Sequence, residues 1–144
     1  MDVAIERVET EAKLADALDV RRAVFVDEQG VPEDRELDGR DDEATHFVAY
    51  LEDEAVGAAR LREYDDATGK AERVAVLEAH RDEGIGRALM DALEAAAREA
   101  GYERVLLHAQ VPVVEFYEYL GYEVTSEEFE DAGIPHREME KPLR

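Results

Sequence analysis

The chain has 144 residues, of which 45% are hydrophobic, and this suits a single domain spanning 1–144 with a sizeable core. It has no cysteine, which excludes disulfides, a thiolate nucleophile and thiolate metal ligands. No run approaches the roughly 18 uninterrupted apolar residues of a membrane span, and residues 1–7 do not resemble a signal peptide. We therefore expect a cytoplasmic protein.

The net charge is strongly negative, with 38 Asp and Glu against 17 Lys and Arg, a formal balance of −21. Such a surface repels nucleic-acid phosphates and anionic lipids, so we expect neither nucleic acid nor a membrane as a partner. An acidic excess along the whole chain, with few lysines among the basic residues, is typical of adaptation to a high-salt cytoplasm. The acidic surface thus predicts a halophilic protein; the alternative is an ordinary acidic protein.

Hydrophobic periodicity and turn residues divide the chain into strands and helices. The order indicates an α+β fold around one mixed sheet, with a further strand possible near the C-terminus. The expected strands are residues 3–8, 45–51, 56–62, 72–77, 104–109, 122–124 and 137–141. The expected helices are residues 10–25 with Thr10 as N-cap, 85–100 before Gly101, and a short aromatic helix between Pro112 and Gly121.

The loop between the strand at 72–77 and the helix from residue 85 is the most informative segment. Gly84 and Gly86 lack a Cβ, so a large anion can approach the backbone N–H groups at the helix start. Arg81 and Arg87 flank this start and can add charge-assisted hydrogen bonds to a diphosphate. The loop therefore predicts a phosphate site; the alternative is a tight turn that uses glycine for its conformation alone.

Three phosphate-binding patterns can be compared with this loop. A Walker A loop needs Gly-Lys-Ser/Thr, whereas Arg87 follows Gly86 here. A dinucleotide fingerprint needs a small residue where Leu89 stands, and an acidic residue where residues 107–109 read Leu-His-Ala. The third pattern, Arg/Gln-x-x-Gly-x-Gly/Ala, is matched in full by residues 81–86.

In its context this loop resembles the acetyl-CoA signature of the GNAT superfamily of N-acetyltransferases. Residues 74–76 precede it as Val-Ala-Val, and residues 116–122 are similar to the family's Phe-Tyr-x-x-x-Gly-Phe/Tyr ending. One departure is Gln110, where many relatives carry Asn. Similarity to the ElaA/YjcF-like branch extends to further short segments, namely residues 25–32, 36–38, 109–110 and 133–136.

The resemblance implies a GNAT-like fold in which the fourth and fifth strands splay apart in a V. The pantetheine arm of acetyl-CoA would lie in this V, and a backbone N–H near Val74 would polarise the thioester carbonyl. The diphosphate would bind N–H groups at the start of the following helix. The implied cofactor-binding residues are Val74, Ala75, Val76, Arg81, Asp82, Glu83, Gly84, Ile85, Gly86, Arg87, Ala88 and Gln110.

The implied activity is direct transfer of an acetyl group from acetyl-CoA to a primary amine of a small molecule, protein or peptide. The motif implies that Tyr117 is the general acid that protonates the departing thiolate; aromatic packing is its alternative role and the favoured one for Phe116 and Tyr119. A non-catalytic acyl-CoA-binding sensor is the alternative function. A homodimer through the last strands is common among similar proteins.

The general base is the least determined part of the site. We prefer Glu28, at the end of the first helix, and His46, at the start of a strand. The four histidines lack the spacing of a ligand pair, so we assign no metal. The further candidates for the base are Glu36, Asp38, His108 and His136.

Arg60 and Arg62 are two residues apart on a strand and therefore face the same side of it. They could bind a carboxylate of the acceptor, but ion pairs with neighbouring acidic residues are the favoured interpretation. The acidic loop at residues 33–43 either covers the acceptor site or is a solvated surface loop.

Overall fold

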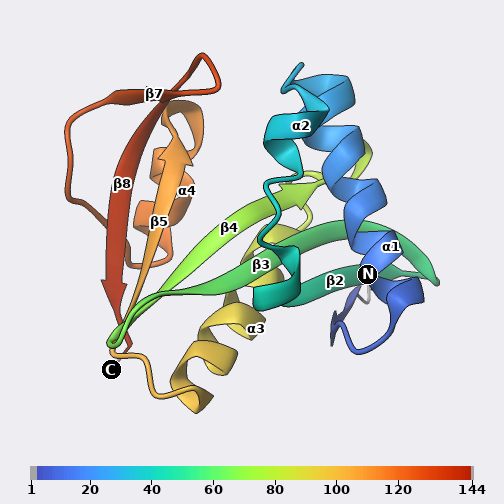
Figure 1. Cartoon of the computed structure of the whole chain (residues 1–144), viewed down its shortest axis with the longest axis horizontal. Coiled ribbons are helices and arrows are strands. Elements are labelled where there is room, and N and C mark those ends of the chain that lie inside the picture. The colour runs from blue at the N-terminus through green and yellow to red at the C-terminus, as the bar shows by residue number, and fades with distance from the viewer. Residues whose placement is uncertain (1–2, 144) are drawn as a thin grey trace.

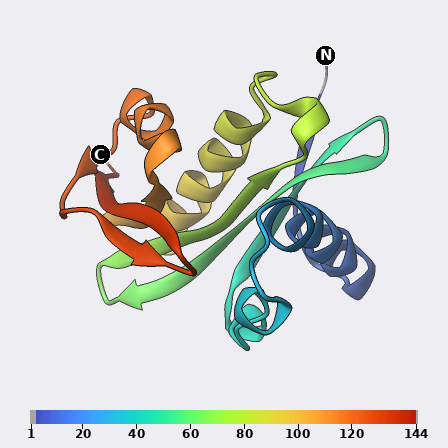
Figure 2. The ribbon, with the colours of Figure 1, turned by 90° about the horizontal axis from the view of Figure 1, so that it is seen from above.

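A computed structural model describes residues 3–143, which form one eight-stranded sheet with helices on both faces (Figures 1 and 2). The strand order is β1-β2-β3-β4-β5-β8-β6, with β7 on β8; β4 and β5 are parallel and the other pairs antiparallel. The strands are β1 Val3–Arg7, β2 Thr45–Leu51, β3 Glu54–Asp65, β4 Thr68–Val76, β5 Arg104–Gln110, β6 Glu123–Val124, β7 Phe129–Asp131 and β8 Ile134–Pro142. The α-helices are α1 Glu11–Arg21, α2 Glu33–Glu36, α3 Ile85–Glu99 and α4 Val114–Tyr119.

Every expected strand and helix is present; several of their boundaries differ by a few residues, and one short helix was not expected. Strand β4 begins at Thr68, four residues before the expected start, because the Asp65 carboxylate accepts a hydrogen bond from the backbone N–H of Ala67 (3.0 Å) and tightens the turn. The first helix is capped by Thr10 as expected, but it continues beyond Arg21 as a π-helix, Arg22–Glu28. The acidic loop contains α2, which the sequence did not predict.

Two hydrophobic cores lie on opposite faces of the sheet. Helix α3 contributes Leu89 and Leu93 to the larger core, and α1 with the π-helix contributes Val20 and Val24 to the smaller one. Side chains of α3 pack closely on the backbone of β3 at Gly57, where a Cβ would lie 2.9 Å from the Leu89 Cδ1 atom. Helices therefore cover both faces of the sheet.

Strands β4 and β5 pair over only four residues each and then separate (Figure 1). The last pair in the register is Ala71 with Leu107. Beyond it β5 stays with β8, whereas β4 stays with β3 through a β-bulge that leaves Arg73 and Val74 outside the register. Arg73 has a φ of 56°, in the left-handed region. The expected V between the fourth and fifth strands is confirmed.

Candidate active site

The diverging ends of β4 and β5 enclose a cleft of about 720 Å³, which lies within the usual range for small-molecule sites. One wall is β4 and the other is β5 with the start of α4. The cleft continues to the loop before α3 and to the end of the π-helix. A single cavity therefore joins most of the residues that the sequence nominated.

The loop before α3 presents backbone donors to one end of this cleft. Gly84 is the N-cap of α3 with a φ of 84°, and no side chain caps the helix. The N–H groups of a first helical turn have no partner within the helix, so here they remain available to an anion. Gly86 has a second role, because a Cβ there would lie 3.2 Å from the Phe116 ring and would disturb the packing of α4 on α3.

Arg81 and Glu28, predicted for two separate roles, form an ion pair with two hydrogen bonds of 2.7 Å. The Nε of Arg81 also donates to the Val76 carbonyl (3.0 Å). The hydrogen bond from Arg81 lowers the pKa of Glu28 below its ordinary value. Glu28 is therefore an ionised partner of Arg81 and a weak proton acceptor.

Tyr117 lies in α4 with its ring buried between Phe116 and Tyr122, at centroid distances of 5.0 and 5.8 Å. It lines the cleft, and its hydroxyl has no hydrogen-bond partner among residues 3–143. Burial raises the pKa of Tyr117 above its ordinary value, so the phenol stays protonated at neutral pH. Both expected roles are thus compatible with its position: the ring packs, and the hydroxyl is free to donate.

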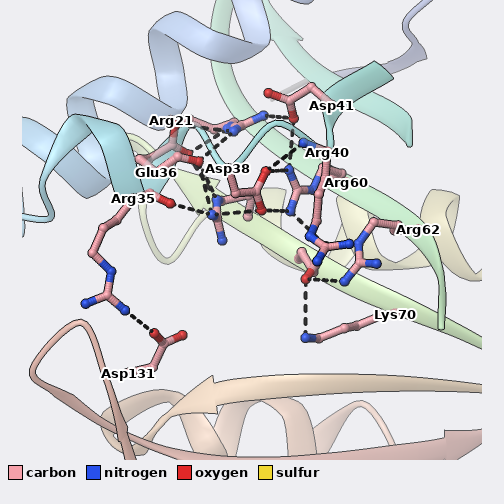
Figure 3. A network of polar contacts seen from close by, with 12 residues as sticks. Arg21, Arg35, Glu36, Asp38, Arg40, Asp41, Arg60, Arg62, Lys70 and Asp131 are labelled. Atoms are coloured by element: carbon pink, nitrogen blue, oxygen red, sulfur yellow. Dashed lines mark hydrogen bonds and ion pairs between the residues drawn. The ribbon is translucent and has the colours of Figure 1, made fainter. Parts of the chain in front are cut away.

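Two side-chain contacts connect the walls of the cleft. Gln110 on β5 donates to the Gln29 side-chain oxygen at the end of the π-helix (2.8 Å). The exposed Arg35 of α2 lies 3.2 Å from Asp131 of β7 (Figure 3). Gln29 and Gln110 are 81 positions apart in the sequence, so the sequence alone did not predict their hydrogen bond.

A network of ion pairs attaches the acidic loop, residues 33–43, to strands β3 and β4 (Figure 3). The fully buried Arg60 of β3 contacts Asp38, Asp41 and Glu72 at 2.8–2.9 Å. Arg62 also contacts Glu72, at 2.9 Å. The favoured interpretation of Arg60 and Arg62, pairing with neighbouring acids, is therefore confirmed.

The same network involves two candidates for the base. Glu36 is almost fully buried between Arg21 (2.8 Å) and Arg73 (3.2 Å). Asp38 contacts Arg60 and Arg73; burial opposes its ionisation, but these arginines outweigh burial and lower its pKa. Both carboxylates are therefore committed to arginines.

The histidines are distributed between the cleft and the network. His46 is buried outside the residues that line the cleft, with its Nε2 2.9 Å from the Asp41 carbonyl oxygen. His108 and His136 both line the cleft. The Nε2 of His108 lies 3.3 Å from Glu138, a neighbour that sequence reasoning missed because the pairing of β5 with β8 is a long-range contact.

Within the described residues, no cluster of three or more histidine or acidic side chains could bind a metal ion. Among the helices at residues 3–143, none is both long enough and apolar enough to cross a membrane.

A mixed sheet splayed between β4 and β5, with a glycine-rich loop before α3, is typical of the acyl-CoA N-acyltransferase fold. In agreement, residues 9–143 match the acetyltransferase (GNAT) domain family. The chain is 48% identical over 132 residues to the uncharacterized N-acetyltransferase YjcF of Bacillus subtilis (strain 168), with 91% of this chain and 94% of YjcF covered. The chain belongs to the GNAT family of acetyltransferases.

Two solved structures extend this comparison. The crystal structure of Escherichia coli ElaA matches with a TM-score of 0.85 and 31% identity, over 97% of this chain and 99% of ElaA. A GNAT family acetyltransferase from Elizabethkingia anophelis, solved with acetyl-CoA bound, matches with a TM-score of 0.76 and 16% identity, over 97% of each chain. At 16% identity, the similarity to the Elizabethkingia anophelis protein shows a shared fold only.

Proposed function

We propose that the protein transfers the acetyl group of acetyl-CoA directly to a primary amine. The observation that carries this proposal is the single cleft onto which the glycine-rich loop, the splayed edge of β4 and the buried Tyr117 all open. The proposal is supported by membership of the GNAT family and by a neighbour of the same fold that binds acetyl-CoA.

In this proposal the backbone of residues 82–88 binds the diphosphate, with Arg87 beside it. The arm of acetyl-CoA runs along Val74–Val76, where β4 has no partner on the side of β5. The bulge supports a role for Val74, because this residue lies outside the register with β3; in this proposal its N–H donates to the thioester carbonyl. Gln110 lies on the opposite wall, facing this arm.

We propose Tyr117 as the general acid. The amine nitrogen forms the new C–N bond, the C–S bond breaks, and the phenol of Tyr117 donates its proton to the departing thiolate. Its burial and its unpartnered hydroxyl support this role. The phenolate then regains a proton from the nitrogen, so no covalent enzyme intermediate is needed.

Replacing Tyr117 by Phe separates this enzyme from the alternative, a non-catalytic acyl-CoA sensor. The variant keeps the ring and its packing, so acetyl-CoA affinity by calorimetry should stay unchanged. Turnover on an amine panel should fall by roughly 10²–10⁴-fold, the usual contribution of general acid catalysis. If neither wild type nor variant acetylates any amine while both bind acetyl-CoA, the sensor is the better description.

The cofactor is tested by thermal unfolding with acetyl-CoA and, as a control, NAD. A ligand at ~100 times its dissociation constant stabilises the folded state by about 2.7 kcal/mol, which raises the midpoint by several degrees for a domain of this size. A rise with acetyl-CoA and none with NAD is expected. No rise with acetyl-CoA at any concentration would contradict the proposal.

We also propose that the acidic surface is an adaptation to high salt. The observations behind it are the net charge of −21 and the scarcity of lysine. Acetylation would then be measured in molar KCl, where the repulsion between surface carboxylates is screened.

A further inference from the structure

His108 occupies the point at which the two arms of the V separate. Leu107 is the last residue of β5 that pairs with β4, and His108 is the next residue along the strand. His108 and Gln110 share a face of β5 because side chains alternate along a strand. Gln110 contacts Gln29 at the end of the π-helix, so this is the face opposite α3. His108 also lines the cleft.

Glu138 defines which ring nitrogen of His108 can accept a proton. Its carboxylate lies 3.3 Å from the Nε2 of His108, and a carboxylate can only accept a hydrogen bond, so Nε2 carries the hydrogen. The lone pair of the neutral ring is then on Nδ1. No residue within 3–143 forms a hydrogen bond with this Nδ1. The arrangement gives an oriented imidazole, in a residue that lines the cleft, whose second ring nitrogen has no hydrogen-bond partner among the described residues.

The charged groups around His108 come from the neighbouring strands. Burial lowers the pKa of His108, and so do the positive charge of Lys70 on β4 and, to a smaller extent, His136 on β8. Glu138 acts in the opposite direction, but the pKa of His108 stays below its ordinary value. The Phe129 ring of β7 packs edge-on at 5.0 Å. The net effect is a neutral imidazole at neutral pH, which is the form that a base requires.

The other candidates lack one or more of these properties. Glu28 is ion-paired with Arg81, and His46 does not line the cleft. His136 lines the cleft, but its Nδ1 contacts the backbone carbonyl of Ile134 (2.7 Å). A neutral carbonyl stabilises an imidazolium less than a carboxylate does. His108 is therefore the candidate that combines access, orientation and a carboxylate partner.

We propose that His108 is the general base of the transfer, accepting on Nδ1 a proton of the acceptor ammonium, and that Glu138 is its positioning residue. This inference rests on the proposed function. The ammonium loses one proton to His108, and the resulting amine forms the C–N bond as the C–S bond breaks. His108 then releases its proton to solvent, so the net products are the amide, the free thiol of coenzyme A and one proton.

The first test is kinetic and uses a primary amine that the wild type acetylates, chosen from a panel of alkyl, aromatic and amino-acid amines. His108→Gln should lower kcat by roughly 10²–10⁴-fold, with acetyl-CoA affinity and melting temperature close to wild type. It should also remove the acid limb of the pH profile of kcat/KM. Turnover and a pH profile equal to wild type would overturn the role of His108 alone. Failure of the wild type on every amine would overturn the proposed function and this role together.

The second test needs no acceptor. The imidazole of His108 is titrated by NMR in the wild type, in Glu138→Gln and in the matched control Glu140→Gln. Glu140 lies two residues further along the same strand, beside Arg104 at 4.0 Å. Removing the Glu138 charge should lower the pKa of His108, and removing the Glu140 charge should leave it unchanged. Equal pKa values in all three proteins would overturn the role of Glu138.

Discussion

Arg60 is the residue whose environment departs furthest from expectation for its type, because its side chain has no exposed surface. Three carboxylates surround its guanidinium, those of Asp38, Asp41 and Glu72, while its Nε finds no partner among residues 3–143. A buried cation is tolerated only when it is paired, and removing one partner leaves the others uncompensated. Arg60 is therefore the cation that joins the acidic loop to β3 and β4, in addition to the contacts that Arg21 and Arg73 make with the same loop.

We predict that Arg60→Met lowers the free energy of unfolding by about 3–5 kcal/mol, since it removes the buried cation that Asp38, Asp41 and Glu72 share. Arg22→Met is the matched control: Arg22 also makes two hydrogen bonds to one carboxylate, that of Glu33, but both side chains are about half exposed. This surface pair should contribute about 0–1 kcal/mol. Urea unfolding of the two variants measures the difference; equal losses would contradict the account.

The network also predicts an acid limit to stability. Burial opposes the ionisation of Glu72, but Arg62, Arg60 and Lys70 outweigh it and lower its pKa from 4.5 to about 2. Because the folded pKa is below the unfolded one, the ionised carboxylate contributes stability that is fully present above about pH 4.5 and is lost as the pH falls toward 2. Glu72→Gln should show a shallower loss of unfolding free energy in this window. Parallel pH curves for variant and wild type would refute the assignment.

At the scale of single elements, α3 begins and ends on glycines with the same backbone conformation. Gly84 at its start has a φ of 84° and Gly101 beyond its end a φ of 87°, and neither has an atom within 4 Å of where a Cβ would stand. An alanine in the left-handed region costs roughly 1–2 kcal/mol. An alanine at either position should therefore meet similar backbone strain, whereas only Gly84 belongs to the proposed diphosphate site.

We predict that Gly84→Ala and Gly101→Ala reduce the free energy of unfolding by similar amounts, about 1–2 kcal/mol each. Only Gly84→Ala should weaken acetyl-CoA binding, by about tenfold, the equivalent of one charge-assisted hydrogen bond. Calorimetry with acetyl-CoA gives the comparison. If both variants bind as wild type does, the loop before α3 is structural and the diphosphate binds elsewhere.

The π-helix at Arg22–Glu28 is a feature that the local sequence pattern did not predict. Apolar spacing predicts one helix from Thr10 to Phe25, and a helical rod does extend through this stretch. After Arg21, however, the backbone hydrogen bonds span five residues instead of four; the N–H of Gln29, for example, donates to the Val24 carbonyl. Glu28 and Gln29, at the end of this segment, line the cleft. The local sequence does not predict the π-helix, because the residues that pack against it belong to β4 and β5: Val24 packs with Ala75, and Gln29 is hydrogen-bonded to Gln110.

At the scale of the whole molecule, the net charge of −21 should make stability depend on salt. We predict that the melting temperature rises between dilute buffer and molar KCl. Most of the rise should occur below about 0.5 M, because the Debye length is already about 10 Å at 0.1 M. Potassium and sodium chloride should act alike if screening is the cause. A melting temperature independent of salt would remove the basis for a halophilic protein.

The sequence by itself predicted the glycine-rich loop and most of the order of elements, and its motifs indicated the family; the V-shaped sheet followed only from the resemblance to that family. The predicted elements and the loop are marked by local patterns: a run of largely apolar residues before the turn at residues 52–54 marks β2, and glycines with flanking arginines mark the loop before α3. The ion pairs of Arg60 and Arg62 were also predictable in kind, since two cations on one face of a strand need partners in so acidic a chain.

Only the tertiary structure decided how the site residues are grouped. It joined Glu28 to Arg81, buried His46 away from the cleft, and set His108 beside Glu138 at the point where β4 and β5 part. These pairings depend on sheet register and on the path of the acidic loop. Both are set by contacts between residues 30 to 50 or more positions apart, such as His108 with Glu138 and Glu28 with Arg81, which no local pattern can specify.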